Sequence, residues 1–149
     1  MSNVVRNVLA VLAGLVIGTV VNIALITISP MIIPLPAGVD PNNSESLSRA
    51  MANNVFETKH YIMPFLAHAL GSLIGAIATF LIAGSYKSRL AYVVALVFLL
   101  GGIAAAVMLP APVWFKVLDL VVAYIPMAWL AAQIGGRMSP GARVSQRTA

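Results

Sequence analysis

The stretch LAYVVALVFLLGGIAAAVML, residues 90–109, contains no charged side chain. An α-helix rises 1.5 Å per residue, so about 20 such residues cross the roughly 30 Å hydrocarbon core of a bilayer. A strand of a membrane barrel would instead alternate apolar and polar residues, and this stretch does not. We therefore predict a transmembrane helix over about residues 89–109.

Three more apolar stretches of similar length lie on either side of it, at about residues 7–29, 61–83 and 112–135. Backbone polar groups in lipid must be bonded within their own segment, which favours helices. The connections at residues 84–88 and 110–112 are short, so each should join antiparallel neighbours. The predicted fold is an all-α, integral membrane bundle of four transmembrane helices, forming a single domain over residues 1–138.

The composition agrees with a bilayer as the main solvent. Sixty per cent of the residues are hydrophobic and 9% are charged, whereas a soluble domain carries about 25% charged residues. The chain has no cysteine, which excludes disulfides and thiolate metal sites. The net charge of +5 is not concentrated in a polar domain. We therefore expect a lipid bilayer, and not nucleic acid, as the partner of the basic residues.

The connection between the first two helices is long and covers residues 30–60. Its first part holds three prolines among apolar residues and should be extended at the interface: Pro30, Pro34 and Pro36. Asp40 followed by Pro41 is typical of an N-cap and first helical residue, which predicts a short helix over about residues 41–56. Apolar residues recur every fourth position there, at Leu47, Met51 and Val55. This amphipathic helix should lie on the membrane surface or cap the bundle.

Lysine and arginine are unevenly distributed between the two ends of the predicted bundle, and their excess marks the cytoplasmic side. One end carries both termini and the 84–88 turn, with Arg6, Lys87, Arg89, Arg137, Arg143 and Arg147. The other end carries Arg49, Lys59 and Lys116. We expect a multi-pass protein of a bacterial inner membrane, with cytoplasmic termini and a disordered tail over residues 139–149. The first apolar run is too long for a signal-peptide core, so it should be retained.

Polar residues from three predicted helices fall at one depth, roughly 10 Å below the outer boundary at 1.5 Å per residue. They are Asn22, His68 and Asp119. The third helix supplies two small residues at that level, Gly101 and Gly102. Within about one turn of Asp119 lie Lys116 and Tyr124.

An ionised carboxylate in hydrocarbon costs on the order of 3 kcal/mol or more. Asp119 should therefore be neutral, paired or facing water. His68 is one available partner, because histidine changes charge near neutral pH. Lys116, three residues earlier on the same helix, is another unless it extends to the outer surface. Two interpretations stay open: a structural network that fixes helix packing, and a proton or ligand site.

Glycines spaced for close helix contact form a second pattern. They are Gly14, Gly18, Gly71, Gly75, Gly101 and Gly102. Small residues four apart let helix backbones approach in lipid. The pattern fits packing within one chain and packing against another copy equally well. With only four helices available, we expect a homo-oligomer or a larger membrane complex.

Motifs of the common enzymes and nucleotide sites are absent: HExxH, a phosphate-binding glycine loop and GxSxG. His60 and His68 are about 12 Å apart along a helix, too far to share one metal ion. We therefore expect no enzyme, no cofactor and no metal site. The leading hypothesis is an accessory or oligomeric subunit of a membrane assembly that acts by helix packing. The alternative is a small proton-linked transporter or channel that uses a buried Asp/His site near the outer face.

Overall fold

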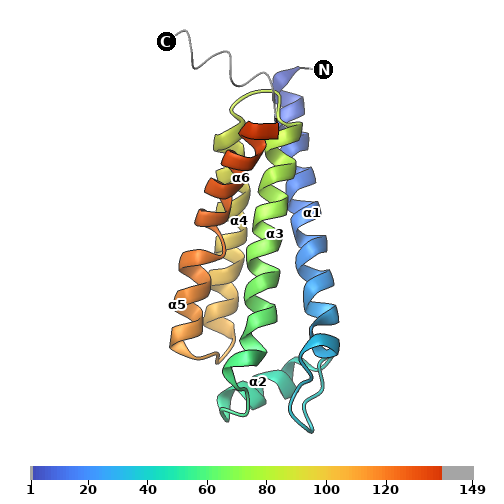
Figure 1. Cartoon of the computed structure of the whole chain (residues 1–149), viewed down its shortest axis with the longest axis vertical. Coiled ribbons are helices and arrows are strands. Elements are labelled where there is room, and N and C mark those ends of the chain that lie inside the picture. Colours follow the sequence, from blue (N-terminus) through green and yellow to red (C-terminus); the bar gives the residue numbers. More distant parts are fainter. Residues whose placement is uncertain (1, 139–149) are drawn as a thin grey trace.

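The computed structural model describes residues 2–138, and the secondary structure in that range is helical, with no strand. Five elements build the bundle: α1 (Asn3–Ile32), α3 (Ile62–Ile82), α4 (Lys87–Met108), α5 (Val113–Val122) and α6 (Ile125–Met138). Two short elements lie in the long connection: α2 (Ser44–Ala52) and the 3-10 turn η1 (Thr58–Tyr61). Figure 1 places α2 at the end of the bundle opposite the N-terminus and the α3–α4 turn. The tail predicted to be disordered lies outside the described residues.

Four helical segments are long and apolar enough to cross a membrane. They are Asn3–Ile32, Thr58–Ile82, Lys87–Met108 and Val113–Met138. The prediction of an all-helical chain with four long apolar helices is confirmed. The first begins earlier than expected, because the Ser2 hydroxyl accepts a hydrogen bond from the Val5 N–H at 3.4 Å. It also continues past residue 29, since Pro30 lies near its end and removes only one helical hydrogen bond there.

The fourth segment, which we predicted as one helix over about residues 112–135, is found as one long apolar segment but is interrupted. α5 ends at Val122 and α6 begins at Ile125. Pro126 has no N–H to donate to the carbonyl of Val122, and its ring clashes with a carbonyl in that position. The helical bonds resume at once on either side: Ala123 N–H donates to Asp119 at 2.9 Å, and Ala128 N–H donates to Tyr124 at 3.0 Å. The break is thus confined to residues 123 and 124.

The short helix in the long connection begins later than predicted. Its N-cap is Asn43, whose Oδ1 accepts hydrogen bonds from the N–H groups of Glu45 and Ser46, each at 3.0 Å. The carboxylate of Asp40, which we expected to be the cap, instead accepts from the Asn42 N–H at 2.9 Å and closes a turn before the helix. Asn43 provides two bonds to the free N–H groups of the first turn, so it starts the helix.

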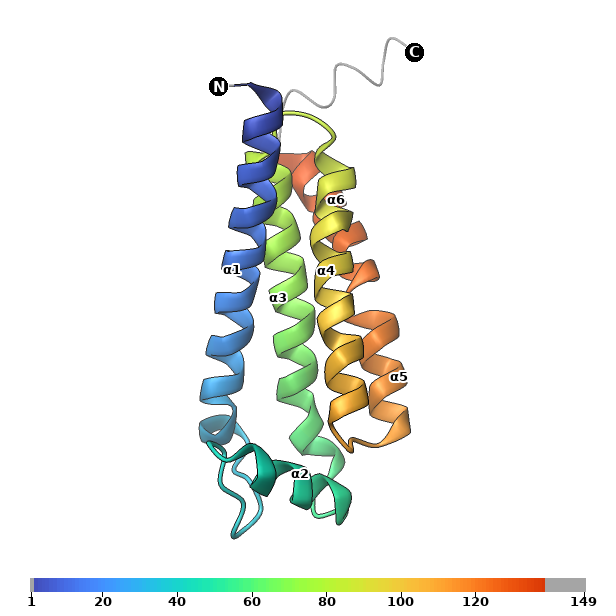
Figure 2. The same cartoon turned by 180° about the vertical axis from the view of Figure 1, so that it is seen from behind.

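The tightest packing joins α1 to α3, which lie side by side in both views (Figures 1 and 2). Gly14 and Gly18 of α1 are in backbone contact with Gly75 and Gly71 of α3, respectively. The Thr79 hydroxyl donates across the same contact to the Ala10 carbonyl at 3.2 Å. Four glycines with no side chain therefore allow two helix backbones to touch.

α3 is the central helix, since α1, α4 and α6 all pack against it. Phe80 anchors its other side, in a buried cluster with Ala91 of α4 and Ala131 of α6. Gly135 of α6 lies against the Phe80 ring, where a larger residue would not fit. Because α3 is central, its residue His68 can meet Asp119 of α5.

Asn7 ties the α3–α4 turn to α1. Its Oδ1 accepts hydrogen bonds from the N–H groups of Gly84 at 3.0 Å and Ser85 at 3.2 Å. Its Nδ2 donates to the Ser85 hydroxyl at 2.9 Å. The neighbouring Arg6 donates to the Ile82 carbonyl at 2.6 Å. One side chain thus satisfies two backbone groups in a turn that has no helical partners for them.

We expect Asn7→Ala to lower the free energy of unfolding by about 2 kcal/mol, because three hydrogen bonds of about 0.5–1.5 kcal/mol each are lost. Asn7→Asp keeps an oxygen for both N–H groups and should lose less than half as much. Thermal unfolding of the purified protein in detergent measures both. Equal losses for the two variants would show that acceptance by Oδ1 does not hold the turn.

Candidate functional site

Asp119 lies in the last turn of α5, beside the break in the fourth segment. It is 5% exposed. His68 Nδ1 lies 2.9 Å from both of its carboxylate oxygens. The Tyr124 hydroxyl, which comes from the break itself, donates to Asp119 Oδ2 at 3.1 Å. The carboxylate of Asp119 is therefore the centre of a hydrogen-bonded group that joins α3, α5 and the break.

His68 lies between the carboxylate of Asp119 and two pockets. Its hydrogen bonds within the described chain both use Nδ1. A ring whose Nδ1–H donates to Asp119 carries a lone pair on Nε2, unless it takes up a second proton there. The side chain is 25% exposed, and it lines two pockets. His68 can therefore accept a proton or a hydrogen bond at Nε2 while Asp119 holds its other side.

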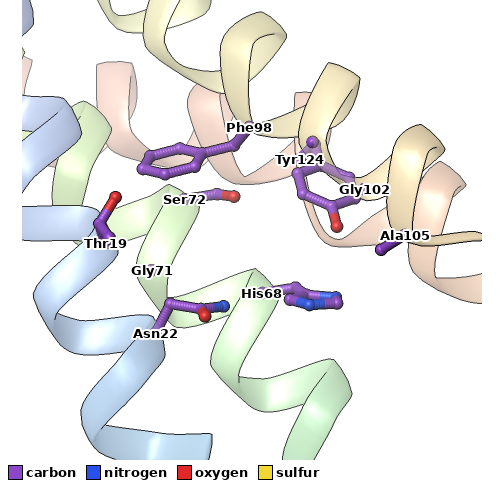
Figure 3. A pocket seen from close by; sticks show the side chains of 10 residues that line it. Thr19, Asn22, His68, Gly71, Ser72, Phe98, Gly102, Ala105 and Tyr124 are labelled. Atoms are coloured by element: carbon purple, nitrogen blue, oxygen red, sulfur yellow. The ribbon is translucent and has the colours of Figure 1, made fainter. Parts of the chain in front are cut away.

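The first pocket has a volume of about 210 Å³ and lies between α1, α3, α4 and the break. Figure 3 shows the side chains of Asn22 and Ser72 extending into the space between these elements, with Tyr124 facing them. Ser72 is 1% exposed, and its hydroxyl has no hydrogen-bond partner among the described residues. A buried polar group without a partner is uncommon and calls for an explanation.

The second pocket, of about 260 Å³, is adjacent to the first and lies under α2. The two share His68, Gly102 and Ala105 in their walls. Apolar side chains dominate the second pocket and include residues of α2 and an aromatic cluster: Leu47, Met51, Phe56, Tyr61 and Phe115. Its charged residues are Lys116 and Asp119.

The predicted polar layer is brought together only in part. His68, Asp119 and Tyr124 are directly bonded. Asn22 lines the same pocket as His68. Lys116 lines the second pocket but takes part in none of the ion pairs found among residues 2–138, which are Arg49–Glu45, Lys59–Glu57 and His68–Asp119.

The second histidine has a different role. His60 Nδ1 accepts from the Glu57 N–H at 2.9 Å, and its Nε2 lies 3.3 Å from the Pro34 carbonyl. Acceptance at Nδ1 places the ring hydrogen on Nε2, which then donates to Pro34. His60 therefore fastens the long connection to η1. No group of three or more His, Cys, Asp or Glu side chains in the part of the chain that the structure describes could hold a metal ion.

Five of the six glycines proposed for helix packing lie against another part of the chain, and Gly101 does not. Those of α1 and α3 meet each other, and Gly102 lies under the Tyr124 ring. A Cβ added to Gly101 would meet nothing within 4 Å, and this residue lines the first pocket. Gly101 thus leaves room for the pocket and does not bring two helices together.

Two features of the site were not predicted. Ser72 was not considered, although it lies four residues after His68 and hence on the same face of a helix. The break that presents Tyr124 was also missed, although Pro126 lies inside the predicted fourth helix and indicates such a break.

Comparison with known proteins adds no relative. No protein-family model matches the chain, and no curated protein or solved structure is significantly similar to it. The function of the chain is therefore inferred from the site itself.

Proposed function

We propose that the chain spans a membrane four times, through α1, α3, α4 and the α5–α6 pair. Its long helices expose many large apolar side chains, which lipid would cover. The end with the α3–α4 turn carries Arg6, Lys87, Arg89 and Arg137, which favours a cytoplasmic location for that end. The α2 end would then face outward from a bacterial inner membrane.

We further propose that the protein is a small proton-linked transporter or channel. The observation that carries this proposal is the contact between the buried carboxylate of Asp119 and His68 at the break of the fourth segment, with His68 in the wall of a pocket. Interrupted helices in membranes are tolerated where they line a cavity, and many transporters bind their solutes at such breaks. In this proposal His68 exchanges a proton with the pocket at Nε2, while Asp119 is hydrogen-bonded to Nδ1.

The competing hypothesis, an accessory subunit that acts by packing, has less support. It was motivated by the glycine pattern, by the outer loop expected to cap the bundle and by the absence of enzyme motifs. Four of those glycines pack against each other within the chain, and Gly102 packs against Tyr124. Among the six, only Gly101 is open, and it faces the first pocket.

Proton flux into proteoliposomes tests the transporter proposal, with a pH-sensitive dye inside and a pH step outside. Wild-type vesicles should equilibrate faster than protein-free vesicles. Asp119→Asn should reduce the rate to that of protein-free vesicles, because a neutral amide supplies no negative charge to balance a protonated His68 ring. Tyr124→Phe, which keeps the His–Asp pair, should have a smaller effect.

Asp40→Asn is the matched control, since it makes the same change in an exposed turn. It should conduct like wild type. Size-exclusion chromatography and circular dichroism establish that each variant is folded. If wild-type vesicles equilibrate no faster than empty ones, or folded Asp119→Asn conducts normally, the proposal is wrong.

A further inference from the structure

The two pockets differ in chemistry although they are adjacent. Ser72 and Asn22 give the first pocket hydroxyl and amide groups close to His68. Leucine, methionine and aromatic side chains give the second an apolar wall. His68, Gly102 and Ala105 belong to both walls, so one elongated ligand can occupy both.

Charge restricts what this ligand can be. No lysine, arginine, aspartate or glutamate lines the first pocket. The second presents one cation, Lys116, and one anion, Asp119, which is already bonded to His68 and Tyr124. An ionic group in the first pocket would have no counter-charge in the lining of that pocket, and a buried unpaired charge costs several kcal/mol. The group of the ligand that occupies the first pocket should therefore be uncharged.

The Ser72 hydroxyl indicates what the polar end of the ligand offers. A buried hydroxyl without a partner costs about 1–3 kcal/mol. A group that both donates and accepts would satisfy it, and the same group could donate to His68 Nε2. A ligand hydroxyl meets both requirements, and the Asn22 amide can bond a second one.

We propose that the two pockets together bind an uncharged amphiphile, with a hydroxyl-bearing head in the first pocket and an apolar chain in the second. This inference rests on the proposed function, because it names the class of solute that the His68 site would handle. The bilayer is the source of such molecules for a site between spanning helices.

Three probes with the same ten-carbon chain test the head-group requirement: 1-decanoylglycerol, decanoate and decylammonium. Glycerol tests whether the chain is needed. Trp114 reports binding, because its ring lies 5.6 Å from that of Tyr61, which lines the second pocket. In a Trp129→Phe background Trp114 is the single tryptophan of the chain. Its fluorescence is titrated with each probe in phosphatidylcholine nanodiscs.

1-Decanoylglycerol should bind at a concentration at least about tenfold lower than either ionic probe, because the ions leave a charge without a partner. Glycerol alone should not bind. Ser72→Ala should weaken binding by roughly 2- to 10-fold, as expected for one hydrogen bond. The same variant should leave the empty protein as stable as wild type or more so, because its hydroxyl has no partner there.

A pair of glycine variants tests where the probe binds. A Cβ at Gly101 and one at Gly136 would both meet nothing within 4 Å, but only Gly101 lines a pocket. Gly101→Leu should fill the first pocket and abolish binding of 1-decanoylglycerol. Gly136→Leu, on α6, should bind like the parent protein.

Tighter binding of decanoate or decylammonium would overturn the inference, and so would normal binding by Gly101→Leu. If no probe binds while Asp119→Asn still stops proton flux, the amphiphile is wrong and the proton-linked function stands. If 1-decanoylglycerol binds as expected but no proton flux occurs, the binding site stands and the transport proposal is wrong.

Discussion

Gly14→Ala should destabilise the bundle by about 3 kcal/mol, at the upper end of the cost of overpacking. A Cβ at this position would lie 2.6 Å from the Gly75 carbonyl oxygen and would also overlap the Thr79 hydroxyl. The carbonyl belongs to helix backbone and cannot rotate away. The two helices must therefore separate, which also breaks the bond from Thr79 to the Ala10 carbonyl.

Gly136→Ala and Gly101→Ala are the matched controls. Nothing lies within 4 Å of a Cβ at either position. Alanine in place of glycine within a helix gains about 0.5–1 kcal/mol from propensity alone. The same substitution should thus have opposite signs at Gly14 and at Gly136. Denaturation by sodium dodecyl sulfate in bicelles measures both, and a neutral Gly14→Ala would show that α1 and α3 are not in backbone contact.

Much of the bundle could be predicted from hydropathy, because a helix that crosses a bilayer needs an apolar run of about 20 residues. Residues 90–109 illustrate this, since α4 ends at Met108, one residue before the predicted end. Helix ends set by local hydrogen bonds were less predictable. The start of α2 depended on whether Asp40 or Asn43 would cap it, and both are good capping residues.

The candidate site was predictable to the extent that depth along each helix brings residues to one level. Depth placed His68 and Asp119 together, and they form a 2.9 Å contact. Depth does not give the rotation of a residue about the helix axis. Lys116 and Asn22 were therefore assigned to the same network, although neither is hydrogen-bonded to Asp119. Spacing of small residues likewise could not distinguish Gly101, which faces a pocket, from Gly102, which packs against Tyr124.

Asp119→Ala should cost about 3–5 kcal/mol of stability, because removing one partner of a buried pair leaves the other uncompensated. Here the orphaned groups are His68 Nδ1 and the Tyr124 hydroxyl. This loss alone does not distinguish a structural network from a functional site, because both interpretations predict it. A variant that removes the whole network does distinguish them.

The triple variant Asp119→Leu, His68→Leu, Tyr124→Phe replaces every member of the network with an apolar residue and leaves no donor or acceptor behind. Replacing a buried charge pair in this way is often neutral or stabilising. If the network serves proton exchange, the triple variant should unfold in one cooperative transition within about 1 kcal/mol of wild type, yet conduct no protons. If it is a structural pin, the triple variant should be as unstable as Asp119→Ala or lose a single cooperative transition. Denaturant unfolding and proton flux on the same preparation therefore separate the two interpretations, because a functional network allows stability to be restored without restoring activity.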